Sequence, residues 1–216
     1  GLVLPPRLAP TQVVILPVLH KEEERARVLE YCDSLKEELS KKSYMGLPIR
    51  VEIDKRDIRG GEKVWGWIKK GVPVRVEVGP RDVAQNAVFA ARRDDGSKKS
   101  VGREEFVETI ADTLKSIQDS MFERAKKYRD ENTVEISSKD EFYSFFTPKN
   151  PKKPEIHGGF AVAYYDGSRE VEEMLKSDLK VTVRCIPLEG GSEGGKCIFT
   201  GKSGEGVVKA VFAKSY

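Results

Sequence analysis

Residues 70–82 read KGVPVRVEVGPRD, and this stretch predicts a strand that ends in a turn. Three valines alternate with Arg75 and Glu77. Because a strand turns successive side chains to opposite faces, we expect buried valines on one side and the two charges together on the other. The Gly-Pro pair that follows cannot continue a ladder, so Arg81 and Asp82 should lie just past the strand, where they can meet a ligand. The alternative is a solvated strand face with ordinary ion pairs.

The residues before this stretch predict a βαβ unit. The run QVVILPV at 12–18 is continuously apolar, as in a central strand. A helix is expected over 21–42, because its apolar residues recur three or four positions apart. A second strand is expected at 49–54, where apolar and charged residues alternate. The crossover between the two strands should be right-handed.

The residues after this unit predict a further helix, a hairpin and a long helix. We expect a short tryptophan-bearing helix over 62–70, before the quoted strand. Strands at 87–91 and 97–101 should pair as a hairpin about Asp95-Gly96. The apolar stripe of 103–129 is typical of a long helix that packs on a sheet.

A second unit is expected to begin near Thr133. It should contain more short strands than helices, together with two loops rich in proline, lysine or glycine. The expected elements are helices at 139–146 and 168–175, strands at 159–165, 181–185, 196–200 and 207–213, and loops at 147–157 and 190–195, the latter mobile.

Composition indicates a globular chain with one basic segment. The chain is 38% hydrophobic, and no apolar run approaches the ~20 residues that a membrane span requires. Three scattered cysteines favour a reducing compartment, so we expect the cytoplasm. Residues 43–103 carry 14 basic and 8 acidic side chains, whereas the rest of the chain is balanced. Such a block is the usual footprint of a polyanion-binding face, although a solvated surface can look the same.

Two motifs that suggest chemistry do not meet its requirements. The stretch CIFTGKSGEG at 197–206, with Gly195 two positions before it, suggests a phosphate loop. Five residues separate Gly195 from Gly201, whereas a phosphate loop requires four residues between these glycines and a helix after them. Cys185 and Cys197 have no further Cys or His after them to complete a zinc site, so we expect both to be buried. The two histidines, His20 and His157, have no nucleophile partner, and we expect a surface or capping role for them. No self-contained active site is visible.

Four stretches carry a resemblance to a known family: GLVLPPRLAP at the start, the quoted KGVPVRVEVGPRD, ARRDDGSKK, and FAKSY at the end. The chain resembles the C-terminal portion of a prolyl-tRNA synthetase of the archaeal and eukaryotic-like type, nearly end to end. The resemblance implies an α/β anticodon-binding domain with a five-stranded mixed sheet flanked by helices, followed by a small α/β domain. The implied domains are a linker at 1–9, the anticodon-binding domain at 10–130 and the C-terminal domain at 131–216.

The resemblance also implies a function. The chain would recognise the anticodon of proline tRNA as part of a class II enzyme that joins proline to tRNA with ATP and magnesium. The missing catalytic domain would carry that chemistry, so the fragment alone should be inactive and hold no cofactor. The parent enzyme is expected to be a homodimer.

The implied ligand is an unstacked anticodon loop with two guanines. Arginine can donate to guanine O6 and N7, and a carboxylate can accept from N1 and N2. In the family's motif, Arg75, Arg81 and Asp82 match base-reading residues, and Lys98 matches a basic residue of the same site. More loosely, the resemblance assigns Lys70, Arg92 and Arg93 to phosphates.

The sequence departs from the family at three places. Ile68 stands where members often have a glutamate, so that contact is absent or comes from a neighbour such as Glu77. Asp166 and Thr200 replace two of the four cysteines with which many members bind zinc, so we expect zinc to be lost. The terminal Tyr216 resembles one whose carboxylate reaches the catalytic domain.

Two other functions remain open. The chain could be a protein-interaction or scaffolding module whose basic block is merely solvated. A small-ligand enzyme of doubly wound type is disfavoured, because no glycine-rich loop follows the first strand.

Overall fold

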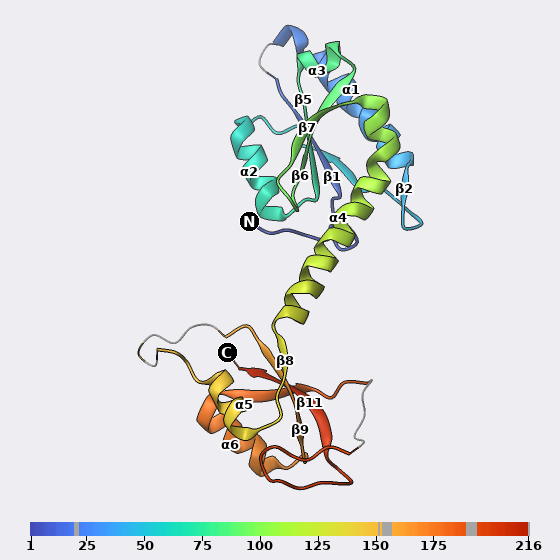
Figure 1. Ribbon diagram of the computed structural model, residues 1–216. Coiled ribbons are helices and arrows are strands. Elements are labelled where there is room, and N and C mark those ends of the chain that lie inside the picture. Colours follow the sequence, from blue (N-terminus) through green and yellow to red (C-terminus); the bar gives the residue numbers. More distant parts are fainter. Residues whose placement is uncertain (20–21, 151, 153–156, 189–193, 216) are drawn as a thin grey trace. The chain divides into compact units, whose positions relative to one another are not determined.

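The computed structural model describes residues 1–19, 22–150, 152, 157–188 and 194–215 (Figure 1). The chain divides into two compact units, Gly1–Arg124 and Ala125–Tyr216, with the boundary inside helix α4 (Arg103–Glu131). Each unit has its own hydrophobic core. His20, Tyr216 and most of the expected glycine-rich loop at 190–195 lie outside the described residues.

The first unit is built on a five-stranded mixed sheet, as expected. Its order is β4-β1-β5-β6-β7, in which β1 runs parallel to β4 and β5, and the last two strands are antiparallel. The parallel pairing of β1 with β4 confirms the predicted βαβ unit. The strands are β1 (Val13–Pro17), β4 (Val51–Ile53), β5 (Val74–Val78), β6 (Ala87–Arg92) and β7 (Lys98–Gly102).

Helices cover the two faces of this sheet unequally. Helices α1 (Glu22–Lys41) and α4 bury their apolar stripes on one face, together with the valines of β5. Helix α2 (Gly60–Lys70) packs on the opposite face (Figure 1). There Trp67 clusters with the β1 side chains Val14 and Leu16. The predicted helix stripes are therefore confirmed, because each buries the residues that recur at helical spacing.

Four short elements were not predicted from the sequence. They are the strands β2 (Ser43–Tyr44), β3 (Leu47–Pro48) and β8 (Thr133–Glu135), and the helix α3 (Pro80–Ala84). Strands β2 and β3 form a hairpin with a two-residue turn. The turn residues, Met45 and Gly46, both have positive φ. A methionine there gives no sequence signal for such a turn, which is normally marked by Asn, Asp or Gly.

The second unit has a four-stranded sheet in the order β10-β11-β9-β8. Its other strands are β9 (Phe160–Tyr165), β10 (Val181–Cys185) and β11 (Val208–Lys214), and its helices are α5 (Lys139–Phe146) and α6 (Arg169–Leu179). Its core contains an aromatic cluster in which the Phe142 ring lies 5.0 Å from that of Phe146 and 5.2 Å from that of Phe212. The expected small α/β domain is thus present.

Two expectations for the second unit are wrong. Residues 196–200 do not form a strand, because only Lys196 makes a bridge, to Ser203, and a turn follows at 198–200. Cys185 is exposed, because β10 is an edge strand and Cys185 is its last residue, whereas Cys197 is buried as expected.

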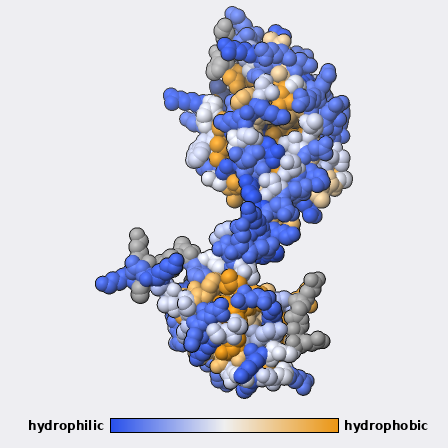
Figure 2. All heavy atoms as spheres, in the orientation of Figure 1, coloured by the Kyte–Doolittle hydropathy of each residue, from blue (hydrophilic) through white to orange (hydrophobic). Residues whose placement is uncertain are grey.

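The surface agrees with a globular chain. No helix within the described ranges is long and apolar enough to cross a bilayer. Figure 2 shows mainly hydrophilic residues on the visible face of each unit, with hydrophobic residues in small patches.

Candidate nucleic-acid interface

The side chains of β5 alternate between the two faces of the sheet, as predicted, but Arg75 is more deeply buried than expected. The three valines are at most 1% exposed and belong to the main core. Glu77, on the other side, is partly exposed, whereas Arg75 is only 4% exposed. The expectation that Arg75 is offered to a ligand is therefore wrong for this structure. The neighbour paired with Arg75 on β1, Val14, belongs to the small cluster that contains Trp67, so Arg75 lies on the face of the sheet on which α2 packs.

Arg75 is a buried charge without full compensation. Within the described residues its Nε has no hydrogen-bond partner. Burial lowers the pKa of the guanidinium, an effect that nearby Glu77 opposes and Arg93 reinforces. An arginine stays charged under these conditions, so Arg75 places a positive charge just beneath the sheet surface.

The pairing register places four further side chains on the same face as Arg75. Residues directly opposite each other in antiparallel strands project to one side. One row across the sheet is Arg75, Ala91 and Lys98, and the next is Glu77, Phe89 and Ser100. We call Glu77, Phe89, Lys98 and Ser100 the open face, since Lys98 and Ser100 are exposed and the other two partly exposed. The predicted residues Glu77 and Lys98 thus lie on one surface.

Phe89 is a candidate that the sequence did not reveal. It belongs to none of the hydrophobic clusters among the described residues, and it lies between Glu77 and Ser100 in the second row. A partly exposed aromatic ring on a sheet surface, with charged and hydroxyl neighbours, can stack on a nucleobase. The alternation of 87–91 predicted the strand, but it could not show which side would remain uncovered.

Arg81 and Asp82 lie beyond the carboxyl end of β5, as predicted, in the short helix α3. Asp82 Oδ2 accepts a hydrogen bond of 2.8 Å from the Gly79 amide and so caps this helix. No described residue bonds the other Asp82 oxygen, and exposed Arg81 has no side-chain partner among the described residues. This pair therefore has one donor group and one acceptor oxygen free for a ligand.

The predicted site residues fall into two groups at opposite ends of β5. Lys70 and Lys98 lie at its amino end, whereas Arg81 and Asp82 lie beyond its carboxyl end. Four residue steps of a strand span roughly 13 Å. Glu77 lies between the two groups. A single base cannot contact both ends, so the two groups would contact different nucleotides.

The three residues loosely assigned to phosphates differ in whether their side chains already have hydrogen-bond or ion-pair partners. Arg92 pairs with Val74 on the α4 side of the sheet, where its guanidinium contacts Asp94 at 2.9 Å and Ser116 at 3.4 Å. The hydrogen bonds that Arg92 donates to Asp94 raise the pKa of Arg92. Arg93 donates to the carbonyls of Gly1 and Leu2. Only Lys70 is exposed and free of ion pairs among the described residues, with its ammonium 4.0 Å from the Trp67 ring centre.

Asp54, which the sequence did not single out, holds the loop between β4 and α2. Its buried carboxylate accepts from Trp67 Nε1 at 2.8 Å and from Arg56 at 2.8 and 2.6 Å, and its carbonyl accepts from Lys63 Nζ at 3.1 Å. The Arg56 hydrogen bonds, more than that of Trp67, hold the pKa of Asp54 well below its usual range, against the effect of burial. This network connects the loop after β4 to helix α2.

The residues at the family's zinc position do not fit a zinc ion. Asp166 accepts from the hydroxyls of Ser168 at 2.6 Å and Thr200 at 2.9 Å, and the Lys202 ammonium lies 3.4 Å from it. These bonds, chiefly that of Ser168, lower the pKa of Asp166 to about 2. An ammonium is not a metal ligand, and no group of three or more metal-binding side chains occurs among the described residues. Hydrogen bonds therefore connect the segments here.

Comparison with known proteins identifies both parts of the chain. Residues 12–113 match the family model of the anticodon binding domain, and residues 152–216 match that of the prolyl-tRNA synthetase C-terminal domain. The chain is 51% identical to proline–tRNA ligase 2 of Anaeromyxobacter dehalogenans, and 50% and 46% identical to the proline–tRNA ligases of Protochlamydia amoebophila and Rhodopirellula baltica.

Each of these alignments covers 100% of this chain and 42% or 43% of the relative, so the chain spans about two fifths of their length. All three relatives are bacterial, and the comparisons do not support an archaeal or eukaryotic-like type. The chain belongs to the prolyl-tRNA synthetase family and corresponds to its C-terminal part, with an anticodon-binding domain followed by the C-terminal domain.

Proposed function

We propose that this chain binds the anticodon loop of proline tRNA as the RNA-recognition part of an ATP-dependent proline–tRNA ligase. The observation that carries the proposal is the open face, which lies within the anticodon-binding match and combines an aromatic ring, a carboxylate and a cation on one partly exposed sheet surface. Bases of a single-stranded loop can stack on such a surface while side chains contact their edges.

The proposal assigns roles by position. Arg81 and Asp82 would read a guanine edge beyond the end of β5, because one donates and the other accepts. Lys98 and Lys70 would contact phosphates at the amino end of the strand. Arg75 would act from beneath, by adding positive potential to the surface without touching a base, since its side chain is buried.

The parent enzyme is also part of the proposal. It would contain a catalytic domain that uses ATP and magnesium, act as a homodimer in the cytoplasm, and use residues 1–9 as linker, 10–130 as anticodon-binding domain and 131–216 as C-terminal domain. Assignment to the archaeal and eukaryotic-like type rests only on the sequence stretches quoted above.

Salt dependence separates this proposal from a scaffolding role. If about six phosphates are neutralised, the logarithm of the association constant for proline tRNA should fall against log salt with a slope of roughly −4. Lys98→Ala should weaken all RNAs alike and reduce the slope by about 0.7, whereas Arg81→Ala should cost about 1–3 kcal/mol mainly against the proline anticodon. The control is Lys36→Ala, an exposed lysine of α1, which should change neither. A flat salt dependence would favour the scaffold.

Phe89 gives a second test of the open face. Phe89→Ala should lower the affinity for an anticodon hairpin by about tenfold or more, because one base–aromatic stack contributes about 1–3 kcal/mol. Phe89→Tyr should restore it. Phe122→Ala removes another ring of the first unit, 60% exposed on α4, and should leave binding unchanged. Equal effects of the two alanine variants in a fluorescence anisotropy titration would refute a stacking role.

A further inference from the structure

Residues 1–9, which we call the strap, belong to the first unit and are bonded to it at several points. The Arg50 guanidinium donates to the Ala9 carbonyl at 2.8 and 3.0 Å. The Leu4 amide donates to the Gly71 carbonyl at 3.1 Å, just after helix α2 ends. The strap is therefore a fixed part of this unit.

Gly71 suits the passage of the strap beside helix α2. It caps the end of the helix with a φ of 73°, in the left-handed region that favours glycine. A Cβ at this position would lie 3.0 Å from atoms of Leu2. The glycine thus serves both the end of the helix and the close approach of the strap.

Arg93 holds the beginning of the strap with one side of its guanidinium. Its Nε donates to the Leu2 carbonyl at 3.0 Å, and its Nη2 donates to the Gly1 carbonyl at 2.9 Å. A guanidinium has five N–H donors in a rigid plane, and those of Arg93 Nη1 have no partner among the described residues. Because two carbonyls fix the plane of the guanidinium, they also fix the direction of its remaining donors.

The acceptors on the strap orient Arg93 without cancelling its charge. The neighbouring Arg92 is bonded to the Asp94 carboxylate at 2.9 Å, which compensates its charge. The partners of Arg93 are backbone carbonyls, which are neutral, and it has no ion pair among the described residues. Arg93 is therefore held in place and keeps its full charge for an anion.

Arg93 lies beside the amino end of the open face. Its amide donates to the Pro73 carbonyl at 2.9 Å, so the pairing of β6 with β5 continues to this position. By alternation, Arg93 projects to the same face as Ala91, whose row contains Arg75 and Lys98. Diagonal neighbours in a sheet are roughly 7–8 Å apart. A phosphate that Lys98 contacts would therefore lie within reach of Arg93.

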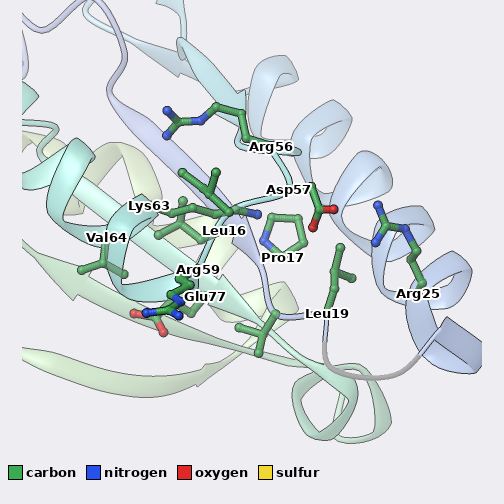
Figure 3. A pocket seen from close by; sticks show the side chains of 13 residues that line it. Leu16, Pro17, Leu19, Arg25, Arg56, Asp57, Arg59, Lys63, Val64 and Glu77 are labelled. Atoms are coloured by element: carbon green, nitrogen blue, oxygen red, sulfur yellow. The ribbon is translucent and has the colours of Figure 1, made fainter.

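A pocket of about 350 Å³ marks the opposite end of this sheet, where β1 ends beside the carboxyl end of β5. Pro17, Arg59 and Glu77 are among the residues that line it (Figure 3). None of its described lining residues belongs to the strap. We therefore expect the strap to act only at the amino end of β5, through a phosphate, and phosphates carry no sequence information.

We infer that docking of the strap and binding of RNA strengthen each other through Arg93. The strap carbonyls hold the guanidinium so that its free donors meet a phosphate, and the phosphate in turn holds Arg93 in the position that bonds the strap. Such coupling is reciprocal, so the factor by which the strap strengthens RNA binding must equal the factor by which RNA strengthens strap docking. The inference rests on the proposed function, because it needs an RNA phosphate beside the open face. In the parent enzyme, the strap would connect this effect to the catalytic domain.

The test compares the full chain with a variant that lacks residues 1–3, using an RNA hairpin with the proline anticodon. The deletion removes the two carbonyls and leaves Arg93 and every residue of the open face in place. It should weaken RNA binding about fivefold or more, since coupling of this kind typically amounts to roughly 5–150-fold. In the full chain, saturating RNA should slow hydrogen exchange of the Leu4 amide by the same factor. The Leu8 and Ala9 amides, which bond to the Pro5 carbonyl at the other end of the strap, should not change.

Arg93→Lys separates the position of the cation from its charge. A lysine keeps the charge but cannot donate to two carbonyls in the fork geometry of a guanidinium. RNA should bind this variant about fivefold more weakly with an unchanged salt slope, and removal of residues 1–3 should then cost nothing further. Arg124→Lys is the matched control, because Arg124 of α4 also donates to a backbone carbonyl, that of Asp94, at 3.0 Å. In that variant the deletion should retain its full effect, and circular dichroism confirms that each variant is folded.

The outcomes separate this inference from the proposed function. Unchanged affinity after the deletion, or Leu4 exchange that RNA does not slow, overturns the coupling even if the chain prefers the proline anticodon. Tighter binding after the deletion, with faster Leu4 exchange on RNA, also overturns it, because Arg93 would then leave the strap to meet the phosphate. The deletion should cost the same for hairpins with and without the two anticodon guanines. A chain that shows the coupling but binds both hairpins equally overturns the proposed specificity for proline tRNA instead.

Discussion

Asp54→Ala is expected to lower the free energy of unfolding of the first unit by about 3 kcal/mol. The substitution leaves the buried Trp67 N–H without its acceptor and removes the charge-assisted hydrogen bonds of Arg56. The Trp67 bond should account for more of the loss, because Trp67 is 5% exposed whereas the Arg56 side chain is 55% exposed and can turn to water.

Urea unfolding followed by tryptophan fluorescence measures this effect in the first unit alone. Both tryptophans, Trp65 and Trp67, belong to α2. The midpoint should fall by roughly 1–2 M urea. Asp57→Ala is the control, because Asp57 is exposed in the same loop and has no side-chain partner among the described residues; it should change stability by less than about 0.5 kcal/mol. A similar midpoint for both variants would contradict the role assigned to Asp54.

The lowered pKa of Asp54 predicts that the free energy of unfolding of the first unit depends on pH. The pKa of Asp54 is lowered in the folded state, first by the Arg56 hydrogen bonds. A group of this kind contributes its full stabilisation above the pKa of the unfolded chain, about 3.9, and loses it as the pH falls further. The fluorescence midpoint should therefore drop below pH 4 in the unaltered chain. This loss should be much smaller in Asp54→Ala, which has no such proton to bind.

Local patterns were sufficient to predict most of the first unit. The stripe of α1 predicted its buried residues and the alternation of β5 predicted its buried valines, though not the burial of Arg75, because periodicity depends only on neighbouring positions. The hairpin of β6 and β7 followed from Asp95-Gly96. The expected strand at 196–200 failed because apolar residues in a short run can also be buried outside a strand, as Cys197 is, between a bridge residue and a turn.

The candidate site was less predictable, because it depends on contacts between distant residues. Alternation placed Arg75 and Glu77 on one side of β5, but it could not show that Arg75 is buried and Glu77 partly exposed, because that depends on how other elements pack on this face. Phe89 became a candidate only through the register of three strands. The bonding of Asp54 to Trp67 joins residues 13 positions apart, and no motif in the sequence marks it.

Exchange of the two anticodon guanines is the second change expected to have a large effect. A base read by direct contacts typically contributes about 1–3 kcal/mol to discrimination, and separate positions add roughly. Contacts to phosphates are indifferent to sequence, so the change should leave the salt slope almost unaltered while affinity falls. Specificity and electrostatic attraction can thus be measured separately on one pair of RNAs.

The most direct measurement is a titration of this chain with proline tRNA, beside the same tRNA with both guanines changed, at one fixed salt concentration. Recognition through the open face and the adjoining end of β5 predicts that the altered tRNA binds about 30-fold or more weakly. Equal affinity for the two tRNAs would contradict it, because the surface would then attract RNA by charge alone.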